Sequence, residues 1–272
     1  MTPDQSSDRI ASVQTKLERA KRHYAELTSE VQRYLATQPY AIASRLDPVS
    51  ARRVYYIDSV QPTPLAISAI LGDTIHNLRS ALDHLAYQLV WIGTGSPPSN
   101  HVYFPIADDK GRYPSQRDKQ IKGARPEAVS AIDQLAPYRG GNDVLWRIHK
   151  LNNVDKHRVL ITAGSAFQSV DIGGIMRREM QAAHDSIPEF AGMVLPQIAL
   201  FLKPADRLFP LKAGSELFID APNAVEDRSM QFQFELAFGE ADVVSGEPII
   251  ETVEPMVTAV EQVIAAFMPM LR

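Results

Sequence analysis

The chain has 272 residues, of which 45% are hydrophobic and 22% are charged, and its formal net charge is −4. This composition is typical of a folded protein with a substantial hydrophobic core, and it excludes global disorder. The negative charge excludes a general positive coat, so a polyanionic partner would need a local basic patch. The absence of cysteine excludes disulfide bonds, thiolate catalysis and cysteine-ligated zinc.

The N-terminal segment does not have the character of a secretory signal. Its sequence, MTPDQSSDRIASVQ, lacks the apolar core of a signal peptide. No apolar run in the chain reaches the roughly 18 residues that suggest a membrane-spanning helix. We therefore expect a cytoplasmic protein with no membrane partner.

The first third of the chain alternates between helical and strand-like patterns. Apolar residues recur at helical spacing over residues 7–37, and Pro39 ends this predicted helix. Residues 40–60 contain two strand-like segments separated by Asp47 and Pro48, which predicts a β-hairpin. A second long helix is predicted over residues 64–92.

Residues 93–125 form a long connection rich in proline, glycine and serine. Loops of this length inside a domain are often functional or disordered. The second half of the connection is locally basic, with Lys110, Arg112, Arg117, Lys119, Lys122 and Arg125. It can be interpreted as a solvated loop or as an arm that contacts phosphate groups.

The rest of the chain is predicted to contain two short helices, several strands and a last helix. The helices cover residues 126–136 and 142–157, and the pattern changes to period two after Arg158. The segments RVLITAGSAF, SVDIGG and IALFL are predicted strands, and MQFQFELAF has the strongest alternation of apolar and polar residues. The last helix covers residues 250–268 and ends before Pro269.

This order of elements predicts an α+β fold, in which a helical bundle packs with an antiparallel sheet. A doubly wound parallel sheet would require strands and helices in alternation. We expect one α+β domain, with a helical part at residues 1–157 and 250–272 and a mainly β part at residues 158–240.

The predicted helix at residues 64–92 has two distinct faces. Its apolar stripe contains Leu71, Ile75, Leu78, Leu82, Leu85 and Leu89. The opposite face carries Asp73, His76, Asn77, Ser80, His84, Tyr87 and Trp91. A freely solvated face usually carries Lys, Glu, Gln and Arg, so these short hydrogen-bonding side chains indicate a partly enclosed face.

The segment WRIHKLNNVDKHR has the same character. Its polar residues recur every three to four positions and so lie along one side of a helix. The two segments together contain four of the seven histidines in the chain. Their candidate polar site consists of Asp73, His76, Asn77, Asp83, Tyr87, His149, Asn153, Asp155, Lys156 and His157. These residues either join two helices through a buried polar network or line a shared functional site.

The stretch HNLRSALDHLAY, in which Arg79 precedes His84 by five positions, resembles the Arg-x4–6-His motif of the HEPN superfamily. Members of this superfamily are helical nucleotide-binding and ribonuclease domains of bacterial toxins and phage-defence systems. The resemblance covers about 30 residues. Ser80 stands where the family often has Asn, Asp or His, and the strands after residue 158 lie outside a minimal HEPN core.

The resemblance implies metal-independent RNA cleavage with Arg79, Ser80 and His84 as the catalytic residues. His84 would be the general acid or base, and Arg79 would hold the scissile phosphate. RNA would then be the partner, and because HEPN sites usually form between two protomers, the resemblance also implies a homodimer. No cofactor is expected, since the sequence contains no phosphate-binding or dinucleotide-binding glycine motif.

Two alternative functions remain open. The histidines and aspartates of the two helical segments could form the metal site of a hydrolase, although no His-Glu-x-x-His motif is present. The protein could also be a non-enzymatic binding or assembly protein, in which the polar helix faces form a buried interface and the β segment contacts a partner.

Overall fold

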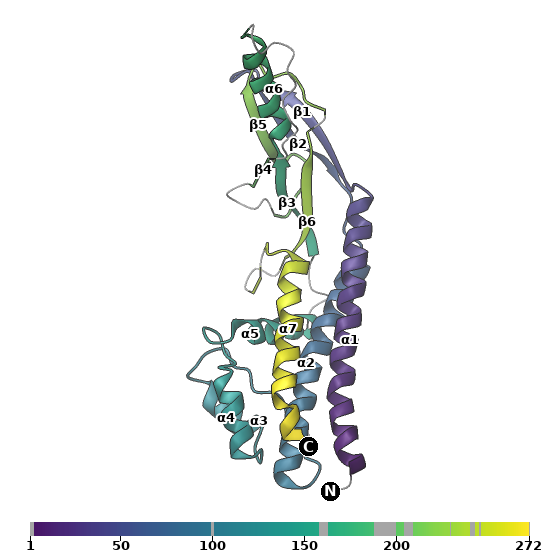
Figure 1. The fold of residues 1–272 in the computed structure, drawn as a ribbon, viewed down its shortest axis with the longest axis vertical. Helices are drawn as coiled ribbons and strands as arrows, with labels where there is room; N and C mark the ends of the chain where they lie inside the picture. The colour runs from purple at the N-terminus through teal and green to yellow at the C-terminus, as the bar shows by residue number, and fades with distance from the viewer. Residues whose placement is uncertain are drawn as a thin grey trace. The chain divides into compact units, whose positions relative to one another are not determined.

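A computed structural model describes residues 3–98, 101–157, 163–187, 200–203, 209–228, 230–239, 243–244 and 246–271. The fold is mixed α+β, as the sequence predicts, and its strands are antiparallel (Figure 1). The helices are α1 (Pro3–Ala36), α2 (Leu65–Thr94), α3 (Tyr113–Gln120), α4 (Pro126–Gln134), α5 (Asp143–His157), α6 (Gly173–Asp185) and α7 (Ile249–Phe267), which a short 3-10 helix (Met268–Leu271) follows. The strands are β1 (Tyr40–Leu46), β2 (Arg52–Val60), β3 (Ala163–Asp171), β4 (Phe201–Leu202), β5 (Glu216–Pro222) and β6 (Phe232–Phe238).

The chain divides into two compact units. The first contains residues 1–31, 64–162 and 240–272, and the second contains residues 32–63 and 163–239. The hairpin of β1 and β2 belongs to the second unit because β2 pairs with β5. The sequence places this hairpin in the helical part, since nothing in its local pattern reveals a partner more than 150 residues away.

The core of the first unit forms around α2. The predicted apolar stripe is confirmed, because the six side chains from Leu71 to Leu89 are at most 2% exposed. α2 packs against α5 and α7, and the guanidinium of Arg9 in α1 lies 4.7 Å from the ring centre of Trp91. Although α2 is rich in apolar residues, none of the described helices is long and apolar enough to cross a membrane.

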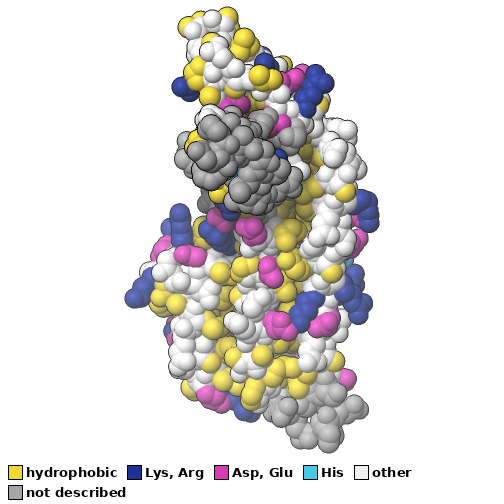
Figure 2. All heavy atoms as spheres, turned by 45° about the horizontal axis from the view of Figure 1, so that its top comes forward, with side chains coloured by type: hydrophobic (Ala, Val, Ile, Leu, Met, Phe, Trp, Pro, Cys, Tyr) yellow, Lys and Arg dark blue, Asp and Glu magenta, His cyan; other side chains and the backbone are white. Residues whose placement is uncertain are grey.

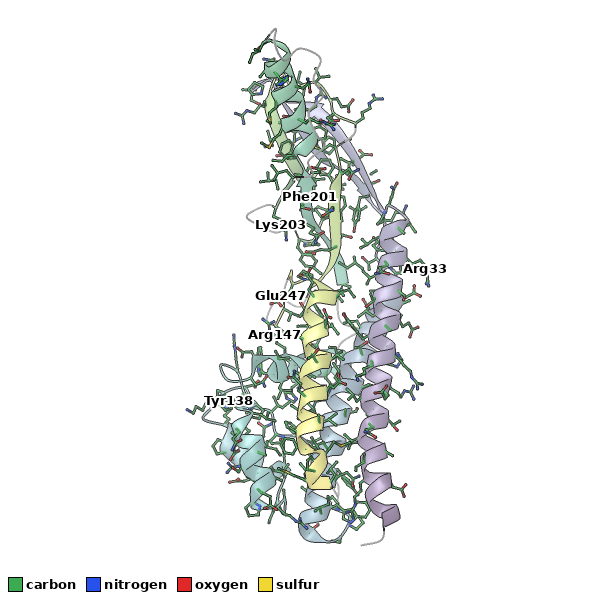
Figure 3. The ribbon with its side chains drawn as sticks, viewed as in Figure 1. Arg33, Tyr138, Arg147, Phe201, Lys203 and Glu247 are labelled. Atoms are coloured by element: carbon green, nitrogen blue, oxygen red, sulfur yellow. The ribbon has the colours of Figure 1, made fainter. Side chains whose placement is uncertain are left out.

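An ion pair joins α5 to the segment that precedes α7. The Nη1 and Nη2 atoms of Arg147 each donate to one carboxylate oxygen of Glu247 at 2.9 Å (Figure 3). Such bidentate pairs fix the orientation of both side chains. The contact therefore holds the start of α7 against α5.

The C-terminal end of α2 lies unusually close to residues 123–125. Gly95 ends the helix in the left-handed region, with a φ of 74°, and its N–H donates to the Trp91 carbonyl. Two residues earlier, a Cβ on Gly93 would collide with the carbonyl oxygen of Gly123. The glycine at position 93 thus allows the backbone of the 101–125 segment to rest directly on α2.

The second unit contains two antiparallel sheets of three strands each, in the orders β1-β2-β5 and β4-β3-β6. Their core includes Ile57 from β2, Phe167 and Val170 from β3 and Leu217 from β5. Phe232 and Phe234 of β6 pack against this core, which agrees with the alternation predicted for MQFQFELAF. The predicted single sheet is therefore two sheets.

Several boundaries differ from the sequence prediction. The 93–125 connection contains the helix α3, because Pro114 is placed in its first turn. The predicted strands at 158–167 and 169–174 correspond to one strand, β3, and residues 158–162 lie outside the described residues. The Asp171 carboxylate accepts the N–H groups of Gly173 and Leu200, so the strand ends there and α6 begins.

Candidate functional site

Arg79, the predicted phosphate-binding residue, is enclosed in the first unit. It is 4% exposed, and its Nη2 donates to Asp83 Oδ1 and to the Phe104 carbonyl, both at 2.7 Å. The same Asp83 oxygen accepts the Phe104 N–H at 2.9 Å. Burial lowers the pKa of Arg79, and the neighbouring Asp83 opposes this shift. The pair therefore fixes the backbone of Phe104 to α2, a role that the i,i+4 spacing of Arg79 and Asp83 could have suggested.

His84 and Tyr87 lie elsewhere on α2. Five residues of helix correspond to a rotation of about 140°, so Arg79 and His84 project from different sides of α2. His84 is half-buried, and burial together with the nearby Lys16 of α1 lowers its pKa, whereas Asp83 acts in the opposite direction. The Tyr87 ring makes an edge contact with Trp91, at 6.1 Å between ring centres.

His76 and Ser80 connect α2 to α5. His76 Nδ1 lies 3.2 Å from Oδ1 of Asn152, which is 2% exposed, and His76 Nε2 lies 3.4 Å from the Ser80 hydroxyl. Both ring nitrogens thus have a partner within the unit. The side chain of Asn77, the residue after His76, donates to the carbonyl of Asp73 at 2.8 Å.

The candidate residues of α5 are also involved in local contacts. Asn153 Nδ2 lies 3.2 Å from His149 Nε2, one turn away on the same helix. Asp155 approaches α2 so closely that a Cβ on Gly72 would collide with its carboxylate. Burial and the like charge of Asp73 raise the pKa of Asp155, while His76 lowers it. Lys156 and His157 belong to the last turn of α5, and their side chains lie outside the described part of the structure.

The structure thus brings His76, Ser80 and Asn152 together across the α2–α5 interface, and it pairs Arg79 with Asp83. It does not bring Arg79 and His84 to one side of the helix. Among the described residues, no group of three or more histidine, aspartate or glutamate side chains is arranged to hold a metal ion.

A pocket in the first unit is lined by Lys119 of the basic segment and by residues that the sequence patterns do not single out. It has a volume of about 480 Å³, and it is lined by His101, Tyr103, Gln116, Lys119 and Gln120. We call it the 101–120 pocket. Tyr103 is 46% exposed although it is adjacent to the fully buried Phe104. His101 has a φ of 92°, an uncommon conformation for a residue with a side chain.

Two sets of contacts hold the walls of the 101–120 pocket in place. Arg79 and Asp83 fix Phe104, the neighbour of Tyr103, as described above. Gln116 Nε2 donates to the Ile106 carbonyl at 2.8 Å and so connects α3 to the same segment. The segment lacks hydrophobic periodicity, so only its long-range contacts determine its position.

Some of the lysines and arginines of residues 110–125 pair with acidic side chains, and others do not. Arg117 pairs with Asp118 and Asp133, and Arg112 pairs with Asp109. Among residues 101–125, the exposed lysines and arginine with no acidic partner within the described part of the structure are Lys110, Lys119, Lys122 and Arg125. On the face visible in Figure 2, lysine and arginine side chains are mixed with aspartate and glutamate side chains. On this face a polyanion would meet local positive charge rather than a broad basic surface.

Comparisons with family models, with curated proteins and with solved structures found no match to this chain.

Proposed function

We propose that the protein binds single-stranded RNA, and that the 101–120 pocket accepts an unpaired base. The observation that carries this proposal is that the exposed Tyr103 and Lys119, a lysine without an acidic partner among the described residues, line the same pocket. Proteins that bind single strands combine aromatic surfaces for bases with positive charges for phosphates. The proposal retains the RNA partner implied by the HEPN resemblance and places it at a different surface.

The other residues of the pocket suit the edge of a base. Gln120 also lines the pocket, and its Oε1 is buried and has no hydrogen-bond partner among the described residues. His101 offers a second ring that can stack or donate. The volume of about 480 Å³ lies within the range of small-ligand sites.

Arg79 and Asp83 enter this proposal as positioning residues. Their contacts with Phe104 determine where Tyr103 lies, and they leave the guanidinium enclosed rather than directed at solvent. RNA cleavage by Arg79, Ser80 and His84 remains a prediction, which the enclosed position of Arg79 does not favour. A catalytic arginine needs access to the phosphate that it stabilises.

The binding proposal is tested by fluorescence anisotropy with a labelled single-stranded RNA of mixed sequence. We expect Tyr103→Ala to weaken binding by about 5- to 150-fold, because stacking on an aromatic side chain contributes about 1–3 kcal/mol per base. Lys110→Ala is the matched control, since Lys110 is exposed, has no acidic partner in the described part of the chain and lies outside the pocket lining. Equal affinities of Tyr103→Ala and the unchanged protein, or stronger binding to duplex than to single-stranded RNA, would refute the proposal.

The cleavage hypothesis requires a separate assay. Total RNA is incubated with the protein in the presence and absence of EDTA, and the His84→Ala variant is compared. EDTA-resistant cleavage that His84→Ala abolishes would support the catalytic assignment. Binding without cleavage would support the RNA-binding proposal alone.

A further inference from the structure

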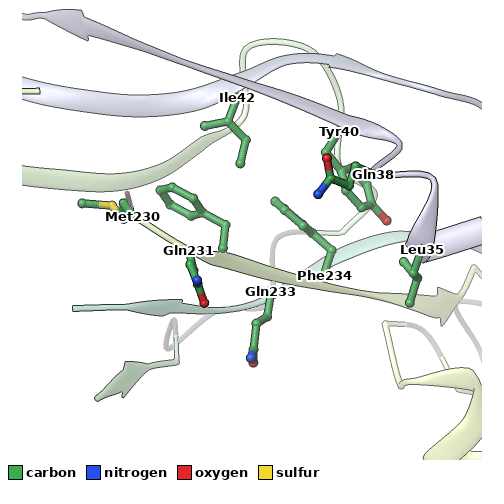
Figure 4. A pocket seen from close by; sticks show the side chains of 9 residues that line it. Leu35, Gln38, Tyr40, Ile42, Met230, Gln231, Gln233 and Phe234 are labelled. Carbon is green, nitrogen blue, oxygen red and sulfur yellow. The ribbon is translucent and has the colours of Figure 1, made fainter. Parts of the chain in front are cut away.

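The second unit has an open groove between the edges of its two sheets. β1 is the last strand of the sheet β1-β2-β5, and β6 is the last strand of the sheet β4-β3-β6. The groove has a volume of about 490 Å³, and its lining includes Tyr40 and Ile42 from β1 and residues 230–234 around the start of β6 (Figure 4). Of the described residues that line it, none has a charged side chain.

The edge of β6 has backbone groups available for another strand. The Gln231 carbonyl accepts the Asp171 N–H of β3 at 2.8 Å, so the backbone of Gln231 faces β3. Because successive residues of a strand direct their N–H and C=O groups to opposite sides, the backbone groups of Phe232 and Phe234 face the open edge. Among the described residues, β6 pairs only with β3.

Exposed strand edges usually carry features that prevent pairing with another chain, such as lysine, proline or a bulge that twists the edge away. Residues 230–234, with the sequence MQFQF, contain no charged residue and no proline. The irregular step of the β3–β6 ladder lies on β3, between Phe167 and Ser169, rather than on β6. The edge of β6 is therefore suited to pairing, and its occupant should be an uncharged strand.

The segment MQFQF is nearly symmetric about Phe232. This symmetry favours a second copy of the same segment as the strand that pairs with the edge of β6. If two copies pair antiparallel about Phe232, each Gln231 lies opposite Gln233 of the other copy. Each Met230 then lies opposite Phe234, and the two Phe232 residues lie opposite each other. Every cross-strand pair thus joins an amide to an amide or an apolar side chain to an apolar side chain, which is the favourable case in sheets.

We propose that the protein forms a homodimer in which β6 pairs with β6 of a second copy about a two-fold axis at Phe232. The outward N–H and C=O groups of Phe232 exchange two hydrogen bonds across the axis, and the Phe234 N–H donates to the Met230 carbonyl of the other copy. The Met230 N–H remains with the Asp227 carbonyl, to which it donates at 3.4 Å. This interface does not depend on the proposed function.

The register follows from the backbone and from burial. Pairing centred on Gln231 or Gln233 would direct the central backbone groups toward β3, where they are already used. Pairing centred on Phe234 would place Leu236 and Phe238 opposite the second copy, but these two side chains are at most 2% exposed within the unit. Phe232 is therefore the centre that uses the exposed part of the edge.

Two double variants that differ only in charge test this register. In Q231K/Q233K each introduced lysine lies opposite an introduced lysine of the other copy, which gives two pairs of like charges across the axis. In Q231K/Q233E each lysine lies opposite a glutamate. Q231K/Q233K loses the hydrogen bond from the Ser169 hydroxyl to Gln233, whereas the carboxylate of Q231K/Q233E can still accept it, so the folding of both variants is compared before their dimerisation.

The oligomeric state is measured by sedimentation velocity over a range of concentrations, with circular dichroism as the check on folding. We expect the unchanged protein to have twice the 30.2 kDa mass of the chain. The dimer dissociation constant should rise about tenfold or more in Q231K/Q233K, because like charges directly opposite each other are unfavourable. It should return toward the original value in Q231K/Q233E. A monomer at all concentrations, or equal dissociation constants for the two variants, would overturn the proposal.

Disulfide trapping gives a second measurement that does not depend on the strength of the dimer. The chain has no cysteine, so an introduced pair can be followed without background. A mixture of Q231C and Q233C chains should form a cross-linked heterodimer under mild oxidation, because these positions lie opposite each other. Q231C alone should cross-link much less. Equal cross-linking in the two samples would exclude the proposed register.

Discussion

The polar side chains of the α2–α5 interface and those of the 101–120 pocket differ in what they bond to. In the first region His76 has partners on both ring nitrogens and Arg79 Nη2 donates to Asp83 and to the Phe104 carbonyl, although the enclosed Arg79 Nη1 and Asp155 Oδ1 have no hydrogen-bond partner among the described residues. In the second region Lys119 has no acidic partner and Gln120 Oε1 has no hydrogen-bond partner within the described residues. Polar groups enclosed between helices serve the fold, whereas an exposed cation beside an open pocket is accessible to a ligand.

The largest effect is expected from breaking the buried ion pair. Asp83→Ala leaves the charge of Arg79 buried and uncompensated, so we expect the free energy of unfolding to fall by about 3–5 kcal/mol. Urea unfolding measures this change, and the exposed Arg112–Asp109 pair provides the control. Arg112→Ala should change stability by less than about 1 kcal/mol. Similar losses in the two variants would mean that Arg79 and Asp83 are not the structural pair described here.

A second prediction concerns the close contact between the 101–125 segment, which lines the 101–120 pocket, and Gly93 of α2. Gly93→Ala places a Cβ against the backbone of residues 123–125, and backbone atoms cannot move aside cheaply, so we expect a loss of about 1–3 kcal/mol. Gly95→Ala is the control, because its Cβ would meet no atom within 4 Å and only its positive φ opposes the substitution. A Gly93→Ala variant more stable than Gly95→Ala would contradict the close contact.

The third prediction distinguishes the pocket from the ion-pair network through the salt dependence of RNA binding. If Lys119 contacts a phosphate, Lys119→Ala should reduce the slope of log affinity against log salt by about 0.7, the value for one phosphate contact in a single strand. Arg117→Ala should leave the slope nearly unchanged, since Arg117 is already paired with Asp118 and Asp133. The same slope for Lys119→Ala and the unchanged protein would remove Lys119 from the interface.

The smallest expected effect is the pH dependence contributed by Asp155. Because its pKa is raised, Asp155 holds its proton more tightly in the folded chain than in the unfolded chain, where the pKa of this carboxyl group is near 3.8. Ionised Asp155 therefore reduces stability above its folded pKa, and this cost disappears as the pH falls toward the unfolded value. We expect Asp155→Asn to raise the melting temperature at about pH 7.5 and to have little effect at about pH 4. A lower melting temperature at about pH 7.5 would show that the carboxylate stabilises the fold.

The sequence predicts the α2 stripe and the partly enclosed character of its polar face because both depend on periodicity within one helix. It does not predict α6, since Gly173 and Gly174 interrupt the pattern and the residues before them suit a strand. It also misses β5, whose pairing with β2 joins residues far apart in the chain.

The 101–120 pocket is missed for a related reason. The position of Tyr103 depends on the hydrogen bonds between Phe104 and the Arg79–Asp83 pair of α2. No local pattern in residues 93–125 reports those bonds. The basic character of the segment is visible in the sequence, but the neutralisation of Arg117 by Asp133 of α4 becomes apparent only in the structure.

The location of the two tryptophans has a spectroscopic consequence. Trp91 lies beneath Arg9 and Trp146 beneath Arg139, and all four residues belong to the first unit. The second unit contains tyrosine and phenylalanine but no tryptophan. Excitation at the red edge of the indole band would therefore follow the melting of the helical unit alone, and a far-ultraviolet signal recorded on the same sample would reveal whether the sheets melt with it.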